Sequence, residues 1–194
     1  EIRITVDRLP TVEIISPHDG KIFNTTSFLV EWIGNDTWSG IDHYELYVNN
    51  TVIDSDIPPT QTSYFVNLTE IGLADGYYTI TIVAYDGSRN RNTTCIYIIV
   101  DTTPPTIVIT SPGDGVVSTT AFIVEWIGYD AVSGIDHYEL YINNTAIDIN
   151  VSPTYTSYLI NLTELGWGEG NYTIRVVAYD KAGYHLSLIH ISEP

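Results

Sequence analysis

The sequence contains two copies of one module, and this repeat constrains the fold more than any other feature. Displaced by 94 residues, the chain matches itself at 41 of the 63 positions from Asn24 to Asp86. The stretch SGIDHYELY at 39–47 recurs unchanged at 133–141. Each copy must bury its own apolar side chains, and a copy of about ninety residues is long enough for one modest core.

The same displacement predicts where each copy begins and ends. Residues 2–7 align with residues 96–101, which have the pattern of a last strand and its exit. We therefore expect residues 1–7 to be the last strand of a preceding module, 8–101 the first complete module and 102–194 the second. Residues 186–194 resemble an in-frame translation of a sequencing adapter, so we expect this end to be non-native.

Apolar residues alternate with period two within each copy, and turn residues interrupt them about every ten positions, which is typical of an antiparallel β-sandwich. No helical period lasts more than a turn. Strands are predicted at 11–15, 28–33, 43–48, 63–68, 78–85 and 94–100. The inward-facing residues of the first copy are predicted to include Phe28, Val30, Trp32, Tyr44, Leu46, Ile80, Ile82 and Ala84. The alternation therefore predicts an all-β fold with two tandem antiparallel β-sandwiches.

These residues resemble the fibronectin type III modules and the related bacterial and archaeal immunoglobulin-like modules over nearly the whole chain. Trp32, Tyr44 with Leu46, and Leu68 followed by Tyr78 stand in the order of that family, as do their counterparts in the second copy. The resemblance implies a tryptophan-centred core and a tyrosine corner. The chain departs from fibronectin in a longer segment before Tyr78 and in lacking Arg-Gly-Asp, so integrin binding is not implied.

The charge and the cysteine content exclude several functions. Lys and Arg number 7 against 24 Asp and Glu, a formal charge of −17, and such a surface repels a phosphate backbone. No apolar run is long enough to span a bilayer. Cys95 is the only cysteine, which excludes an intrachain disulfide, and its strand position predicts a small packed residue. We therefore expect neither nucleic-acid binding nor a membrane span in this stretch.

Aspartates fall where loops should meet at one end of each sandwich. Carboxylates gathered with carbonyl oxygens are ligands that Ca²⁺ prefers, so a calcium site is one reading of the pattern. The other reading is that each aspartate caps its own turn, and the absence of any dense aspartate motif favours this second reading. The candidate ligands are Asp7, Asp36, Asp42 and Asp86 in the first copy and Asp101, Asp130, Asp136 and Asp180 in the second.

Asn-x-Ser/Thr sequons are frequent in the chain. They matter only if the protein is exported to a glycosylating compartment, and an Asn- and Thr-rich sequence also generates them by chance. Most are predicted at strand ends or in loops, where a glycan would fit. The candidate acceptors are Asn24, Asn35, Asn49, Asn67, Asn92, Asn143, Asn150, Asn161 and Asn171.

No catalytic motif is present, and we expect the chain not to be an enzyme and to need no cofactor other than calcium. His43 and His137 alternate with inward tyrosines, so each is predicted to be a lone, outward-facing histidine. Glycosidases use a pair of carboxylates, but nothing in the sequence distinguishes one such pair from the many acidic residues.

We expect a non-catalytic spacer or adhesion repeat of an extracellular or cell-surface protein, whose partners are neighbouring modules of the same chain. Pro104 and Pro105 favour an extended, semi-rigid linker between the copies. One alternative is recognition of a carbohydrate or a surface protein through exposed tyrosines and Trp38, which is Val132 in the second copy. Another is an accessory region of a secreted hydrolase.

Overall fold

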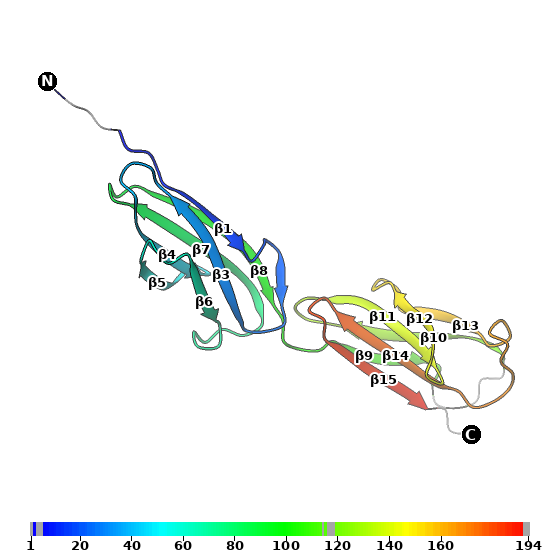
Figure 1. Ribbon diagram of the computed structural model, residues 1–194. Helices are drawn as coiled ribbons and strands as arrows, with labels where there is room; N and C mark the ends of the chain where they lie inside the picture. Colours follow the sequence, from blue (N-terminus) through cyan, green and yellow to red (C-terminus); the bar gives the residue numbers. More distant parts are fainter. Residues whose placement is uncertain (1, 3–5, 114, 116–118, 192–194) are drawn as a thin grey trace. The chain divides into compact units, whose positions relative to one another are not determined.

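The computed structural model describes residues 2, 6–113, 115 and 119–191, and it divides into two compact units, Glu1–Asp101 and Thr102–Pro194. All regular secondary structure in the described part of the chain is β-strand (Figure 1). Within that part, no helix is long and apolar enough to cross a membrane. The expected all-β fold with two tandem sandwiches is confirmed. Most of the expected strand at 2–7 lies outside the described residues.

The first unit packs two sheets face to face. One sheet has the order β1 (Thr11–Ser16), β3 (Ser27–Asn35) and β6 (Ser63–Asn67). The other has the order β2 (Lys21–Phe23), β8 (Arg91–Val100), β7 (Gly76–Asp86), β4 (Ile41–Val48) and β5 (Thr51–Ile57). All pairs are antiparallel except β2 with β8.

Two of these strands were not predicted from the sequence. Strand β2 has only three residues, and its polar neighbours conceal the alternation. Strand β5 pairs with β4 through a register that shifts twice, so its burial does not follow period two. Strands β4 and β5 are joined by Asn49 and Asn50, whose φ values of 47° and 65° lie in the left-handed region that asparagine tolerates.

The second unit has the same two-sheet plan. One sheet has the order β13 (Ser157–Asn161), β10 (Ala121–Tyr129) and β9 (Thr106–Ser111). The other has the order β12 (Thr145–Val151), β11 (Ile135–Ile142), β14 (Thr173–Asp180) and β15 (His185–Ile191). Strand β15 pairs with β14 over seven residues, so part of the stretch that resembles adapter sequence is paired as a last strand.

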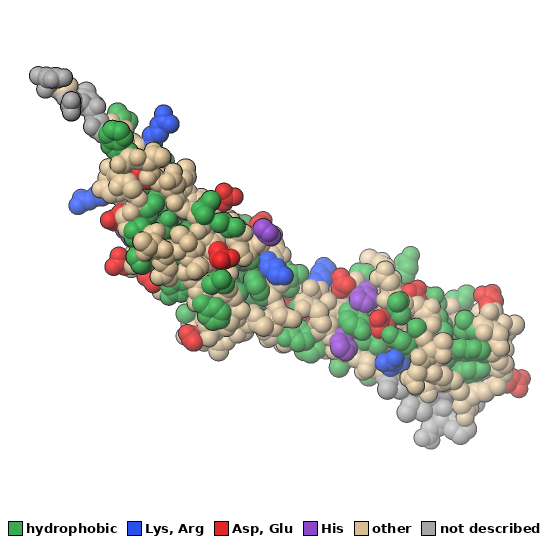
Figure 2. Space-filling view, viewed as in Figure 1, with side chains coloured by type: hydrophobic (Ala, Val, Ile, Leu, Met, Phe, Trp, Pro, Cys, Tyr) green, Lys and Arg blue, Asp and Glu red, His purple; other side chains and the backbone are tan. Residues whose placement is uncertain are grey.

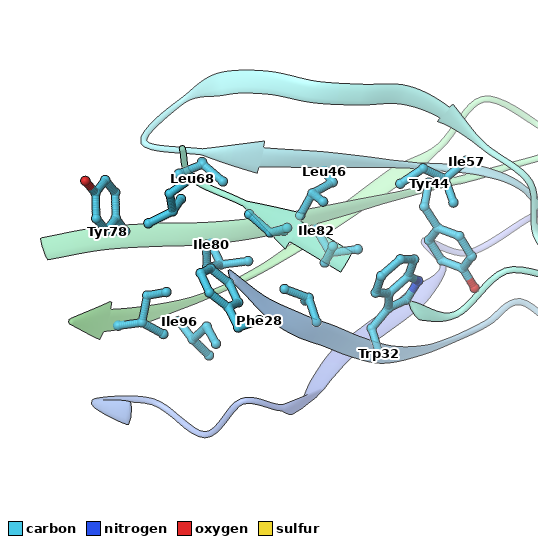
Figure 3. Packing of buried hydrophobic residues seen from close by; sticks show 14 of the residues in the cluster. Phe28, Trp32, Tyr44, Leu46, Ile57, Leu68, Tyr78, Ile80, Ile82 and Ile96 are labelled. Atoms are coloured by element: carbon cyan, nitrogen blue, oxygen red, sulfur yellow. The ribbon is translucent and has the colours of Figure 1, made fainter. Parts of the chain in front are cut away.

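Alternate residues of the inner strands build the core of the first unit (Figure 3). All eight predicted inward residues are buried. Trp32 of β3 and Tyr44 of β4 come from opposite sheets and meet edge to face, with ring centroids 5.5 Å apart. Trp126 and Tyr138 repeat this contact at 5.5 Å. Such aromatic pairs stabilise a core by about 1 kcal/mol beyond their burial.

A glycine makes room for this contact in each unit. A Cβ atom placed on Gly34 would lie 2.4 Å from Tyr44 Oη, and one on Gly128 would lie 2.5 Å from Tyr138 Oη. These distances are far below van der Waals contact, so the tyrosine ring occupies the space that a side chain would need. Gly34 and Gly128 are therefore required by packing and not by backbone conformation.

The expected tyrosine corner is present in both units. The Tyr78 hydroxyl donates to the carbonyl of Ala74, and the Tyr172 hydroxyl donates to the carbonyl of Gly168 at 2.7 Å. Leu68 and Leu162 are buried beside these corners. Each corner fixes the long connection that leads into an inner strand, β7 in the first unit and β14 in the second.

Two predictions about single side chains were wrong: that Cys95 is packed and that His43 has no side-chain partner. Cys95 lies on a strand as expected, but it is exposed on β8 and not packed, because it falls on the outer side of the alternation. His43 is not alone: its ring stacks on Tyr85 with centroids 4.5 Å apart, and its Nδ1 is 2.8 Å from Asp42 Oδ2. His137 stacks on Tyr179 at 4.5 Å and is paired with Asp136 in the same way.

We predict that Gly34→Ala destabilises the first unit by about 1–3 kcal/mol, because the methyl group forces Tyr44 away from Trp32. Urea denaturation measures the change. Gly168→Ala is the matched control, since a Cβ there meets nothing within 4 Å. Equal stability of the two variants would show that Tyr44 can move without cost.

Candidate functional site

One end of the first sandwich gathers three aspartates from separate segments. Asp7 lies in the segment before β1, Asp36 directly follows β3, and Asp86 ends β7. One carboxylate oxygen from each lies within 4.8 Å of the others. Three residues of the predicted calcium set thus meet, because the segments that carry them converge at the same end of the two sheets.

Asp36 organises the loop between β3 and β4. Its Oδ1 accepts hydrogen bonds from the backbone N–H groups of Trp38, Ser39 and Gly40 at 3.1, 2.8 and 2.8 Å. The Ser39 hydroxyl donates to the same oxygen at 3.3 Å. Aspartate suits such a turn because its short side chain reaches the N–H groups that follow it.

Asp86 does the same for the loop between β7 and β8, and it is 1% exposed. Its Oδ1 accepts from the N–H groups of Ser88 and Asn90, at 2.9 and 2.8 Å, and its Oδ2 accepts from Asn90 Nδ2 at 2.9 Å. Asp36 and Asp86 therefore both cap turns, which is one of the two roles that the sequence left open. It does not exclude a cation, because a carboxylate oxygen can bind on more than one side.

Asp7 differs from the other two because its carboxylate has a buried oxygen without a hydrogen-bond partner among the described residues. Its Oδ1 accepts from the N–H of Arg8 at 2.9 Å. Its Oδ2 is buried and has no hydrogen-bond partner among the described residues. Buried polar atoms are seldom left unpaired, so this oxygen has unfilled capacity for a ligand.

Nearby hydroxyls favour the ionised form of Asp7. Ser88 first, and then Ser39, lower the pKa of this carboxyl below its ordinary value, although neither is in hydrogen-bonding geometry with Oδ2. A lowered pKa means that ionised Asp7 favours the folded state, an effect present above about pH 4 and lost as the pH falls through the folded pKa. At neutral pH the cluster therefore offers an anionic oxygen from Asp7.

Among the described residues, no Lys, Arg or His side chain forms an ion pair with this cluster. In the described part of the protein, the ion pairs are those of His43 with Asp42 and His137 with Asp136. No Lys or Arg of that part pairs with Asp7, Asp36 or Asp86. Like charges at this spacing repel, and a divalent cation is the ordinary means of offsetting such repulsion.

Asp42 was grouped with these residues from the sequence but lies outside the cluster. It is exposed, and its carboxylate holds the His43 ring. Asp136 is placed in the same way beside His137. Both are exposed at a register shift, between Ile41 and His43 in β4 and between Ile135 and His137 in β11, and period-two alternation does not reveal such a shift.

The other predicted ligands occupy the equivalent places in the sequence. Asp130 follows β10, and its Oδ1 accepts from the N–H of Gly134 at 2.6 Å. Asp180 ends β14, and its Oδ1 accepts from the N–H of Tyr184 at 2.9 Å. Asp101 ends the first unit, where it is buried and its N–H donates to the carbonyl of Phe23 at 2.9 Å.

The predicted glycan acceptors divide into two groups. The amide nitrogens of Asn67 and Asn161 donate to Glu70 and Glu164, and that of Asn92 donates to the carbonyl of Pro10. These three side chains are partly buried and engaged. The exposed candidates are Asn24, Asn35, Asn49, Asn143, Asn150 and Asn171. Their glycosylation stays a prediction.

Two further surface features of the described residues could contact a ligand. Trp38 is 70% exposed at the tip of the loop that Asp36 organises. A shallow hollow of about 170 Å³ lies over β1 and β3, lined by residues that include Glu13, Ile33 and Asn35. Acidic side chains are scattered over the face in Figure 2 and do not gather in one patch there.

The paired sheets and the repeated Trp–Tyr core define a protein of tandem immunoglobulin-like modules. The sequence profile of the bacterial Ig domain matches residues 10–82 and 105–176, once in each unit. The chain therefore belongs to the bacterial Ig domain family, which confirms the resemblance inferred from the sequence. No curated protein sequence matches the chain significantly.

Several solved structures align with this chain. The Sidekick-1 immunoglobulin domains 1–5 align over 96% of this chain and 39% of theirs, with 10% identity and a TM-score of 0.53. The fibronectin(III)-like modules of Clostridium thermocellum CbhA align over 94% of both chains, with 20% identity and a TM-score of 0.49. A bacterial ice-binding adhesin aligns over 96% of this chain and 65% of its own, with 15% identity and a TM-score of 0.45.

We predict that Asp36→Ala destabilises the chelator-treated protein by about 1–3 kcal/mol, because three N–H groups lose their acceptor. Asp42→Ala is the matched control and should cost less than about 1 kcal/mol, as is usual for an exposed ion pair. Urea denaturation in EDTA measures both. A larger loss for Asp42→Ala would contradict the structural role assigned to Asp36.

Proposed function

We propose that the chain is a non-catalytic spacer or adhesion segment of an extracellular or cell-surface protein. The observation that carries this proposal is the duplication of a complete module, in which each copy has its own tryptophan-centred core. Modules of this kind can be repeated without disturbing their neighbours, which suits a protein that must gain length. The acidic surface favours solubility of such a repeat.

Adhesion requires a surface that recognises a partner, and Trp38 supports that alternative. It is exposed, and the second copy has Val132 in its place, so recognition through Trp38 would belong to the first module alone. A spacer needs no such asymmetry. The two functions therefore predict different effects of Trp38→Ala.

The spacer function predicts that the chain makes a distal epitope more accessible. A peptide epitope would be displayed on cells, joined to a membrane anchor either through residues 1–194 or through a short Gly/Ser linker, and titrated with an antibody. We expect stronger antibody binding with the chain present, and Trp38→Ala should leave it unchanged. Equal binding with the short linker would contradict the spacer function.

The same cells, without antibody, would be tested on immobilised neutral glycans. Retention that disappears in Trp38→Ala would favour recognition over spacing. No retention of either form would leave recognition of these glycans unsupported. Trp38 is 70% exposed whereas Trp32 is 1% exposed, so Trp38→Ala should not disturb the core.

We further propose that Asp7, Asp36 and Asp86 bind a divalent cation, with Ca²⁺ as the best match to an all-oxygen donor set. The proposal is supported by the convergence of three carboxylates and by the unused, buried Oδ2 of Asp7. These residues would hold the ion, which would tie the segment before β1 to the two loops. By sequence position, Asp101, Asp130 and Asp180 are the counterparts in the second copy.

Ca²⁺ at millimolar concentration should raise the melting temperature of the chain by several degrees, because an ion that binds only the folded state stabilises it. Asp7→Asn should reduce this shift. Asp42→Asn should keep the full shift, since Asp42 lies outside the cluster. Calorimetric scans in Ca²⁺ and in EDTA measure the effect. An unchanged melt of the parent protein in the two buffers would dismiss the site.

A further inference from the structure

The outer face of the three-stranded sheet in the first unit is apolar, although a strand face that meets solvent is ordinarily polar. Strand β3 turns Leu29, Glu31 and Ile33 away from the core, and Leu29 is 45% and Ile33 54% exposed. Phe65 of β6 stands directly opposite Leu29 and is 64% exposed. Large apolar side chains therefore lie at both ends of a row whose centre is Glu31.

The second unit has the same arrangement on its own three-stranded sheet. Strand β10 turns Ile123, Glu125 and Ile127 outward, with Leu159 opposite Ile123 and Val108 opposite Ile127. These four apolar side chains are between 51% and 64% exposed. Single exposed apolar residues are common, but a contiguous group of them is typical of an interaction surface. We call this surface of each unit its apolar face.

The charges on the two apolar faces all have one sign. Strands β1, β3 and β6 contain no Lys or Arg, and the same is true of β9, β10 and β13. Their charged residues are Glu13 and Glu31 in the first unit and Glu125 in the second, and all three are exposed. A partner that complements such a face presents apolar groups on either side of a cation.

The spacing of the face indicates the shape of that partner. Successive outward residues of a strand lie about 7 Å apart, so Glu31 stands about midway between Leu29 and Ile33. An extended segment that alternates apolar, basic and apolar side chains on one side has the same period. In the first unit, the hollow of about 170 Å³ lies beside Ile33 and Glu13 and offers a seat for a side chain at that end.

A second copy of this chain fits the face poorly. Two apolar faces laid together would set carboxylates against carboxylates without a cation between them. The whole chain carries a formal charge of −17, which adds to the repulsion between copies. The charges therefore favour a basic partner over self-association.

We propose that the apolar face of each module docks an extended, basic segment of a partner protein, with a Lys or Arg at Glu31 or Glu125 and apolar side chains on either side of it. The proposal goes beyond the spacer or adhesion function, because it assigns a surface and the chemistry of a partner. It makes no use of Trp38, which lies in the loop between β3 and β4.

Solution NMR of the full 194-residue chain tests the proposal, with the synthetic peptide TTLTKTLTT as the probe. In extended form this peptide places two Leu and one Lys on the same side at the spacing of the face. We expect amide shifts in β1, β3 and β6 and in β9, β10 and β13, and little change elsewhere. The peptide TTLTETLTT, with Glu in place of Lys, should bind at least roughly fivefold more weakly, because like charges then meet.

Variants in the first module can be compared with the second module in the same sample. Glu31→Lys should weaken binding of TTLTKTLTT to the first module by roughly fivefold, because an attraction becomes a repulsion. Leu29→Ser should weaken it by a similar factor through lost apolar contact. Asp56→Lys is the matched control: it makes the same charge change at an exposed residue of β5, on the other sheet, and should leave the affinity unchanged.

Equal binding of the Lys and Glu peptides would overturn the proposal, and this comparison requires no variant of the protein. Absence of shifts, or shifts centred on other strands, would overturn it as well. Shifts in the same strands on concentrating the chain without peptide would show that a second copy occupies the face, against the partner proposed. None of these measurements uses the displayed epitope or Trp38, so failure here is distinguishable from failure of the spacer or adhesion function.

Discussion

The contact between Trp32 and Tyr44 is the interaction on which the rest of each module depends. It joins the two sheets within the core, because each ring comes from a different sheet and each is 1% exposed. The ring of Tyr44 also lies against Gly34, so three residues of two strands fix the distance between the layers. The second copy keeps Trp126, Gly128 and Tyr138 in the same relation.

The core positions the ends of the loops at one end of the first sandwich, and aspartates of these loops set their shape. Asp36 stands two residues after Gly34, and Asp86 stands two residues after the buried Ala84. Once the sheets are packed, these two carboxylates must lie close together whether or not an ion joins them. Their hydrogen bonds to backbone N–H groups shape the loops, and the carboxylate of Asp7 completes the proposed cation site.

Strand order adds a feature that the core alone does not decide. Strand β2 lies beside β8, the last strand of the first unit, and runs parallel to it, whereas every other strand pair of that unit is antiparallel. At the end of this pair, the N–H of Asp101 donates to the carbonyl of Phe23. The pairing therefore joins the segment after β1 to the end of the unit.

The sequence by itself determined the repeat, the two-sheet fold and the inward face, because period-two alternation reports directly which side chains leave water. It also placed Trp32, Tyr44 and the tyrosine corner. Only the tertiary structure decided that Asp42 leaves the aspartate cluster and that His43 stacks on Tyr85. It alone revealed β2 beside β8. These features depend on strand register and on pairing between distant segments, and local alternation carries no record of either.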